Sequence, residues 1–140
     1  MYIKISEATN QETEPFEIEE WPYADMEHYE KKVKYNNKKF IFKAEIDNKV
    51  VGCIKGKLES GVLNIDYLIV AHDKKGLGIG KELTLKAEDF GKIEGAHKIH
   101  LYTGKSWEAE KFYQKLGYKE LVVIPNHNFN MDFVIYEKTI

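Results

Sequence analysis

The sequence has a single cysteine, Cys53, so no disulfide can form within the chain, and a lone cysteine suits a reducing compartment. No apolar run approaches the length that spans a bilayer, and the first residues hold no signal-peptide core. His72, His97 and His100 show no metal-ligand spacing with that cysteine. A formal net charge of −2 gives no reason to expect nucleic-acid binding. We therefore expect a cytoplasmic protein without a metal, a membrane segment or a nucleic-acid partner.

Length and composition indicate a globular protein. At 140 residues the chain is long enough to bury a hydrophobic core, and we predict a single domain over residues 1–140. Hydrophobic residues make up 43% of the chain and charged residues 31%, which is ordinary for a soluble domain. The sequence shows no internal repeat and no low-complexity linker.

Residues 65–90 carry the strongest local signal. Ile65 to Val70 form a short apolar run, typical of a strand covered on both faces. Three glycines at alternate positions follow, and apolar residues then recur at helical spacing: Gly76, Gly78, Gly80, Leu83, Ala87 and Phe90. A glycine loop that opens a helix presents unpaired amides and the positive end of the helix dipole to one point. The pattern therefore predicts a phosphate-binding loop.

The spacing of the loop separates three kinds of phosphate site. A nucleoside-triphosphate P-loop needs a glycine where Lys75 stands and a hydroxyl where Glu82 stands. A dinucleotide fingerprint needs G-x-G-x-x-G and an acidic residue after the next strand, but the glycines here run G-x-G-x-G and residues 98–102 end without a carboxylate. The third pattern is [Q/R]-x-x-G-x-[G/A] after a strand that ends in valine. Residues 75–80, K-G-L-G-I-G, resemble it, with lysine at the first position.

This third pattern is the acyl-CoA pyrophosphate loop of the GNAT N-acetyltransferase superfamily, and a second stretch strengthens the resemblance. Residues 106–118, S-W-E-A-E-K-F-Y-Q-K-L-G-Y, are similar to the family's segment N-x-x-A-x-x-F-Y-x-K-x-G-F. The two motifs occur in the family's order and at its spacing. The resemblance covers about residues 40–138, and the first forty residues are only generically compatible with it.

The order of predicted elements gives an α/β fold with a mixed, mostly antiparallel sheet of about seven strands flanked by helices. Strands are expected at 2–6, 40–46, 50–58, 62–70, 98–102, 118–124 and 129–137. Pro15 and Pro22 limit any helix before about residue 23, so the first helix is expected at 25–34. Two further helices follow residue 78 and residue 106. A helix between the fourth and fifth strands makes these two parallel neighbours. In the family they splay apart, and the pantetheine arm lies between them.

The resemblance implies acetyl-CoA as cosubstrate and points to the residues that hold it. The matching positions are Ile69, Val70, Lys75, Gly76, Leu77, Gly78, Ile79, Gly80 and Lys81. The amide of Val70 would also stabilise the oxyanion of the tetrahedral intermediate, and such a donor is worth roughly 3 kcal/mol. Lys75 supplies a point charge without bidentate geometry. Ser106 stands at the family's asparagine and would contact the CoA arm or serve only as an N-cap.

Proton transfer is assigned in the same way. Tyr113 matches the family's general acid, which protonates the departing thiolate, and also lines the cofactor site. Family members with a carboxylate base often carry glutamate at the position of Asn64, and asparagine cannot accept the proton. Asp66, on the same strand, is therefore our candidate base. A water relay or His127 in the last loop are the alternatives.

These residues predict an N-acetyltransferase that moves an acetyl group from acetyl-CoA to a primary amine of a small molecule or peptide, by direct transfer in a ternary complex. Cys53 has no matching histidine, which argues against an acyl-cysteine route. The acidic run at 12–27 would attract a cationic amine or form a solvated face, and Trp21 and Tyr23 would line the acceptor pocket or only pin the loop. The alternative function is a non-catalytic acyl-CoA sensor with the same fold. Homodimers are common in the family and remain open here.

Overall fold

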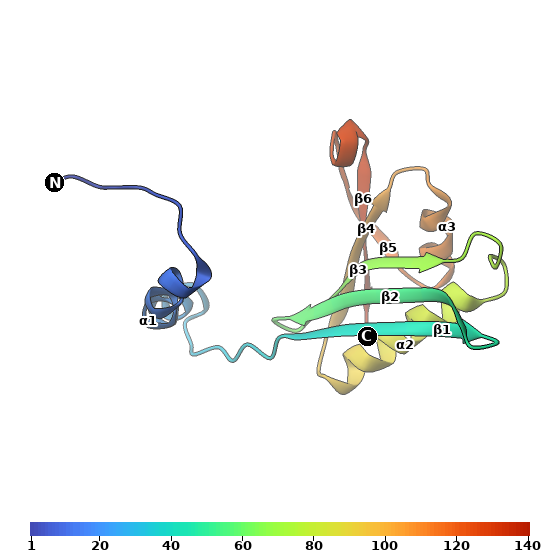
Figure 1. Cartoon of the computed structure of the whole chain (residues 1–140), viewed down its shortest axis with the longest axis horizontal. Coiled ribbons are helices and arrows are strands. Elements are labelled where there is room, and N and C mark those ends of the chain that lie inside the picture. Colours follow the sequence, from blue (N-terminus) through green and yellow to red (C-terminus); the bar gives the residue numbers. More distant parts are fainter. The chain divides into compact units, whose positions relative to one another are not determined.

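The computed structural model describes residues 1–140, which divide into two compact units, residues 1–35 and residues 36–140. Each unit is described by itself. The first contains one helix and the second contains the sheet with two helices (Figure 1).

The first unit is built around α1 (Asn10–Tyr29). A capping box starts this helix, because the main-chain N–H of Thr9 donates to the Glu12 carboxylate at 2.6 Å. The helix ends at Glu30, where the backbone turns left-handed, and the Tyr35 hydroxyl donates to the buried Asp25 carboxylate at 2.6 Å.

Two expectations for this unit are wrong. The helix starts at residue 10 and runs through both prolines, although it was expected to begin near residue 25. Each proline removes its own N–H bond and crowds the carbonyl four residues before it, but the glutamate-rich turns around it are good helix formers. Residues 2–6 form no strand, and their side chains are exposed. A five-residue alternating run becomes a strand only where another strand pairs with it.

The second unit contains a six-stranded, mostly antiparallel sheet in the order β1-β2-β3-β4-β6-β5. The strands are β1 (Lys38–Ile46), β2 (Lys49–Glu59), β3 (Val62–Val70), β4 (Lys98–Gly104), β5 (Lys119–Ile124) and β6 (Phe133–Thr139). Only β3 and β4 pair in parallel, as expected from the helix between them. The count is six because residues 2–6 add no strand.

Turn residues fix the hairpins. Asp47 and Asn48, between β1 and β2, both have positive φ, and so do Ser60 and Gly61, between β2 and β3. The last strand begins at residue 133 and was expected at 129–137. The chain first makes the 3₁₀ turn η1 (Asn128–Asn130), in which Phe129 takes a left-handed conformation that no strand can contain.

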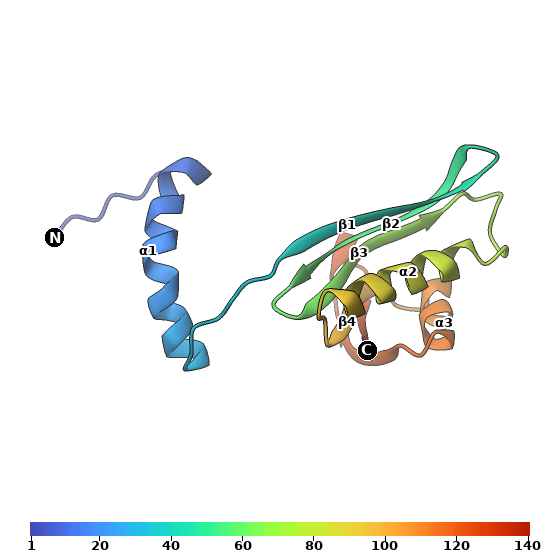
Figure 2. The same ribbon diagram turned by 90° about the horizontal axis from the view of Figure 1, so that it is seen from below.

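Both helices of this unit, α2 (Ile79–Ile93) and α3 (Glu108–Lys115), lie on one face of the sheet (Figure 2). Two residues of β6 join this face of the sheet to the helices. Tyr136 donates to the Glu110 carboxylate of α3 at 2.8 Å, and Lys138 donates to the Glu88 carboxylate of α2 at 2.5 Å. Between helices and sheet lies the core, whose fully buried members include Ile54, Leu63, Ile99, Val134 and Tyr136. Each such aliphatic side chain stabilises the fold by roughly 1.5–3 kcal/mol.

Candidate active site

The site starts where β3 and β4 separate. Their pairing consists of three residue pairs and ends with Asn64 opposite His100, while β3 continues to Val70 and β4 to Gly104. A bulge at Asp66 lies just beyond this last pair, because Gly56 of β2 pairs with Ile65 and the preceding Lys55 pairs with Tyr67. The two strands therefore form a fork that opens toward their C-terminal ends, as the resemblance implied.

The glycine loop joins the open end of β3 to α2. Gly76 and Gly78 both have φ of +82°, and a Cβ added at either would meet no atom within 4 Å. Gly78 is the N-cap of α2, so the first amides of the helix point out of its end. No main-chain N–H from Lys75 to Lys81 donates a hydrogen bond within the chain. The loop thus presents a row of free donors beside open space, which is what an anionic ligand requires.

Between the fork, this loop and α3 lies a cavity of about 570 Å³, a size common for ligand sites. Its lining is formed by the end of β3, the loop, the start of α2 and one side of α3: Leu68, Ile69, Val70, Lys74, Lys75, Gly76, Gly78, Ile79, Gly80, Lys81, Glu108, Ala109, Phe112, Tyr113, Lys115 and Leu116. Four of these residues are lysines and one is a carboxylate, and the chain contains no arginine. The polar part of the lining is therefore mainly cationic, and the rest of the lining is apolar.

Tyr113, the expected general acid, is the one tyrosine that lines this cavity. It belongs to α3 and is 6% exposed, with its ring centroid 5.0 Å from that of Phe112 and 5.3 Å from that of Tyr118. Burial raises the pKa of Tyr113 to about 12. The phenol therefore stays protonated throughout the physiological range, as a general acid must, although the same burial makes it a weaker acid.

The structure brings most of the expected cofactor residues together but leaves three expected site residues outside the cavity. Leu77 contributes to a neighbouring cavity, and Asp66 is exposed at the bulge of β3. Ser106 has a φ of +68° and its N–H donates to the Glu110 carboxylate. The N-cap of α3 is Trp107, so the alternative assignment of Ser106 as N-cap is wrong.

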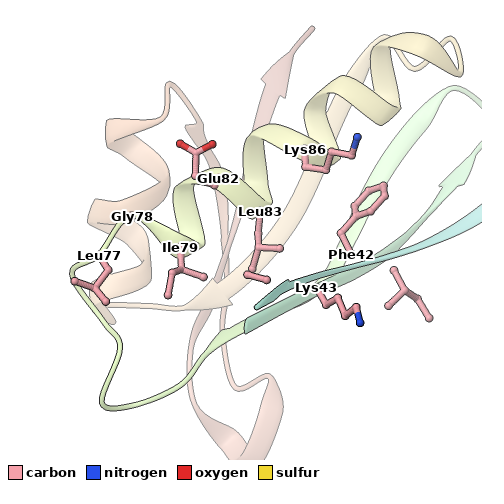
Figure 3. Close-up of a pocket in the computed structure, with 10 residues that line it drawn as sticks. Phe42, Lys43, Leu77, Gly78, Ile79, Glu82, Leu83 and Lys86 are labelled. Atoms are coloured by element: carbon pink, nitrogen blue, oxygen red, sulfur yellow. The ribbon is translucent and has the colours of Figure 1, made fainter. Parts of the chain in front are cut away.

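A second cavity, of about 610 Å³, lies on the other flank of α2, against β1. Figure 3 shows Phe42 of β1 and Leu83 of α2 at this cavity, with the Glu82 carboxylate turned away from Phe42. The Lys86 ammonium lies 5.6 Å from the Phe42 ring centroid. Gly78 and Ile79 border both cavities, but the cavity against β1 is lined by no tyrosine and does not reach the fork. We therefore place the candidate active site in the cavity that contains Tyr113.

The other reactive side chains lie outside that cavity. Cys53 and His72 line a third depression, of about 490 Å³, without a hydrogen bond between them. His127 packs edge-on against Tyr102, with ring centroids 5.4 Å apart. No group of three or more metal-ligating side chains occurs in the structure, and no helix is long and apolar enough to cross a membrane.

Comparison with known proteins identifies the family. The sequence profile of the GNAT acetyltransferase family matches residues 5–118, most of the chain, so the protein belongs to that family. It is 34% identical over 89 residues to an uncharacterized N-acetyltransferase of Methanocaldococcus jannaschii. That match covers 62% of this chain and 57% of the relative's length.

Solved structures share the fold. A crystal structure of an acetyltransferase from Bacillus cereus superposes with a TM-score of 0.78 at 26% identity, covering 99% of this chain and 98% of that one. An aminoglycoside 6′-N-acetyltransferase complexed with coenzyme A gives 0.66 at 21% identity, with 72% of each chain covered. A family member from Elizabethkingia anophelis with acetyl-CoA bound gives 0.66 at 19% identity, covering 71% of this chain and 75% of that one.

Proposed function

We propose that this protein is an N-acetyltransferase that moves the acetyl group of acetyl-CoA to a primary amine, by direct transfer in a ternary complex. One observation carries the proposal: a single cavity combines free main-chain donors, four lysines and a buried tyrosine at the fork between β3 and β4. Membership of the GNAT family and the solved relatives that hold coenzyme A or acetyl-CoA support it.

Two parts of the cavity lining suit the two parts of acetyl-CoA, its diphosphate and its pantetheine arm. The free amides from Lys75 to Lys81 would bind the diphosphate, with Lys74 and Lys115 as further cations. Ile69 and Val70, at the end of β3, would bind the pantetheine arm through the main-chain groups that β4 leaves unpaired. The amide of Val70 would then stabilise the negative charge that develops on the thioester oxygen.

The chemistry requires two proton transfers. The amine nitrogen attacks the thioester carbon and loses a proton, the C–S bond breaks, and the thiolate leaves with a proton from the Tyr113 hydroxyl. General acid catalysis of this kind contributes about 10²- to 10⁴-fold. Asp66 remains our sequence-based candidate for the base, although it is exposed at the bulge.

The acceptor is proposed to be a primary amine of a small molecule or a peptide. Proteins with this fold include an aminoglycoside 6′-N-acetyltransferase and a ribosomal-protein-S18-alanine N-acetyltransferase, which represent both kinds. We further propose a cytoplasmic protein, which its lone free cysteine suits. We also propose a single functional domain, because the family match crosses from the first unit into the second.

The proposal is tested by measuring release of the CoA thiol from several acyl-CoAs over a panel of small and peptide amines. Acetyl-dependent turnover with at least one amine is expected, and coenzyme A binding by calorimetry without any turnover would instead favour the non-catalytic acyl-CoA sensor. Tyr113→Phe should keep coenzyme A binding but lose about 10²-fold or more in kcat. Tyr118→Phe is the matched control, since it removes a neighbouring buried hydroxyl that has no hydrogen-bond partner and does not line the cavity. Equal kcat for the two variants would remove the role of Tyr113.

A further inference from the structure

The face of the fork turned away from the helices holds the groups that an incoming amine would meet. Ile99 and Leu101 are buried under the helices, and side chains alternate along a strand, so His100 and Tyr102 of β4 point to the opposite face. Because α2 and α3 cover the cofactor cavity on one face, an amine would reach the acyl carbon from the opposite face. A proton acceptor on this side of the sheet would lie on its path.

His100 lies at the base of the fork, where the last β3–β4 pair joins it to Asn64. Its ring Nδ1 is 3.1 Å from the Asn64 Oδ1, and the Asn64 amide nitrogen faces the carbonyl of Val62 at 3.5 Å. An amide oxygen can only accept, so the imidazole Nδ1 donates its hydrogen to it. The neutral ring then keeps its bare nitrogen at Nε2, and no other group bonds to that atom. Asn64 thus sets the tautomer that a proton acceptor needs.

The surroundings keep this imidazole neutral. Partial burial and the Lys98 ammonium lower the pKa of His100, while Glu137 acts in the opposite direction. Glu137, which faces His100 from β6, is held by Lys98 at 2.9 Å, so its charge is shared. The remaining groups on this face near the fork are Asn64 and the exposed carboxylate of Asp66 on β3, Lys57, which pairs with Asn64 from β2, Tyr102 on β4, and Lys119, which pairs with Glu137 from β5. None of these surrounds His100 with net negative charge.

We propose that His100 Nε2, positioned by Asn64, accepts the proton of the acceptor amine through a bridging water. This inference rests on the proposed acetyl transfer. Asn64 lies four positions before Leu68, the first residue of β3 at the cavity, so the amine and one water would occupy the open fork between His100 and the acyl group. As the nitrogen bonds to the thioester carbon, its proton passes to the water and the water's proton passes to Nε2. The thiolate takes its proton from Tyr113, and the imidazolium later returns its proton to solvent.

Other candidates on this face fit less well. Asp66 is exposed at the bulge and has no hydrogen-bonding partner that orients it. Glu137 is paired with Lys98, and accepting a proton would break that ion pair. His127 belongs to the β5–β6 loop, where its ring packs against Tyr102 and Phe133. His100 alone combines a defined tautomer, a free acceptor atom and a place at the base of the fork.

The test is the pH dependence of kcat in the whole 140-residue chain, with the best amine of the panel. Wild type should show a rising limb governed by the lowered pKa of His100. His100→Asn keeps an N–H donor for Asn64 but lacks the second ring nitrogen, so kcat should fall by about 10²-fold and the limb should disappear. His97→Asn is the matched control, because this exposed histidine precedes β4 by one residue, and it should keep the wild-type profile.

A second variant does not depend on removing the imidazole. Lys98→Met removes the cation that lowers the pKa of His100, so the rising limb should move to higher pH while coenzyme A binding stays unchanged. NMR titration of the His100 ring, in wild type and in Lys98→Met, should give a pKa that matches the midpoint of the rising limb of kcat in the same protein. If Lys98→Met, or a folded His100→Asn that binds coenzyme A, shows the wild-type pH profile of kcat, the role of His100 is refuted while the proposed acetyl transfer stands. Binding of coenzyme A without turnover in wild type would refute the proposed function, and the inference would fall with it.

Discussion

Alanine at Gly78 should separate cofactor binding from backbone strain. Gly78 has a φ of +82° and caps α2 beside the proposed diphosphate site. Gly95 follows the other end of the same helix with a φ of +87°, and a Cβ at either glycine would meet nothing within 4 Å. The two positions are thus matched in conformation and in free space. They differ in that only Gly78 lines the cavity.

The structure sets the size of each effect. A left-handed alanine costs about 1–2 kcal/mol relative to glycine, so both variants should lose that much stability, or about 4–8 °C in Tm for a chain of this length. At Gly78 the new methyl also stands where the diphosphate would meet the amides. Loss of one charge-assisted hydrogen bond costs about 1.5–3 kcal/mol, which weakens coenzyme A binding about 10- to 100-fold. At Gly95 the expected change in Kd is negligible.

The assay is calorimetric titration with coenzyme A, run at a temperature where both variants are folded, next to thermal unfolding of each without ligand. Equal loss of stability with unequal Kd is the expected result. If Gly78→Ala binds coenzyme A as tightly as Gly95→Ala does, the loop amides do not hold the diphosphate. If only Gly78→Ala loses stability, the two positions are not matched and strain explains the weaker binding.

Two further predictions concern the fold. Gly56→Ala should destabilise the protein by about 3 kcal/mol, because its Cβ would lie 2.0 Å from the Asn64 carbonyl oxygen; an unchanged urea midpoint would contradict this contact. Glu88→Gln should cost about 1–3 kcal/mol, because it takes the carboxylate partner from Lys138, whereas Asp89→Asn on the exposed side of the same helix should change the urea midpoint little.

The sequence predicted the parts of the fold that local chemistry specifies. The hairpins follow from Asp47-Asn48 and Ser60-Gly61, whose residues accept positive φ, and their strands lie within two residues of the expected bounds. The helix after the glycine loop and the parallel β3–β4 pair follow from one rule, that a helical crossover joins parallel neighbours. The mixed, mostly antiparallel sheet, with six strands where about seven were expected, the GNAT family and the fork are confirmed in this way.

The errors have three separate causes. Whether residues 2–6 form a strand depends on a partner strand, which their own alternation cannot reveal. The length of α1 depends on its capping box at Thr9 as much as on its prolines, and the prolines were given too much weight. The last strand starts later than expected because Phe129 has a left-handed backbone conformation. Phenylalanine rarely adopts this conformation, so its presence in the sequence does not predict it.

The contact between Asn64 and His100 could not be found from the sequence for a related reason. In parallel strands the register depends on how a whole crossover packs, so 36 residues of chain decide which side chain of β4 faces Asn64. The strand period of two then places His100 on one face and the buried Leu101, toward α3 and Tyr113, on the other. A single parallel pair that stops after three residue pairs leaves the fork open. The acyl group would lie there, with the proposed proton donor on one side and the proposed acceptor on the other. The same crossover begins with the loop whose free amides would hold the cofactor, so one β-α-β unit would supply the cofactor loop, the gap and the proposed proton acceptor, and α3 would add Tyr113.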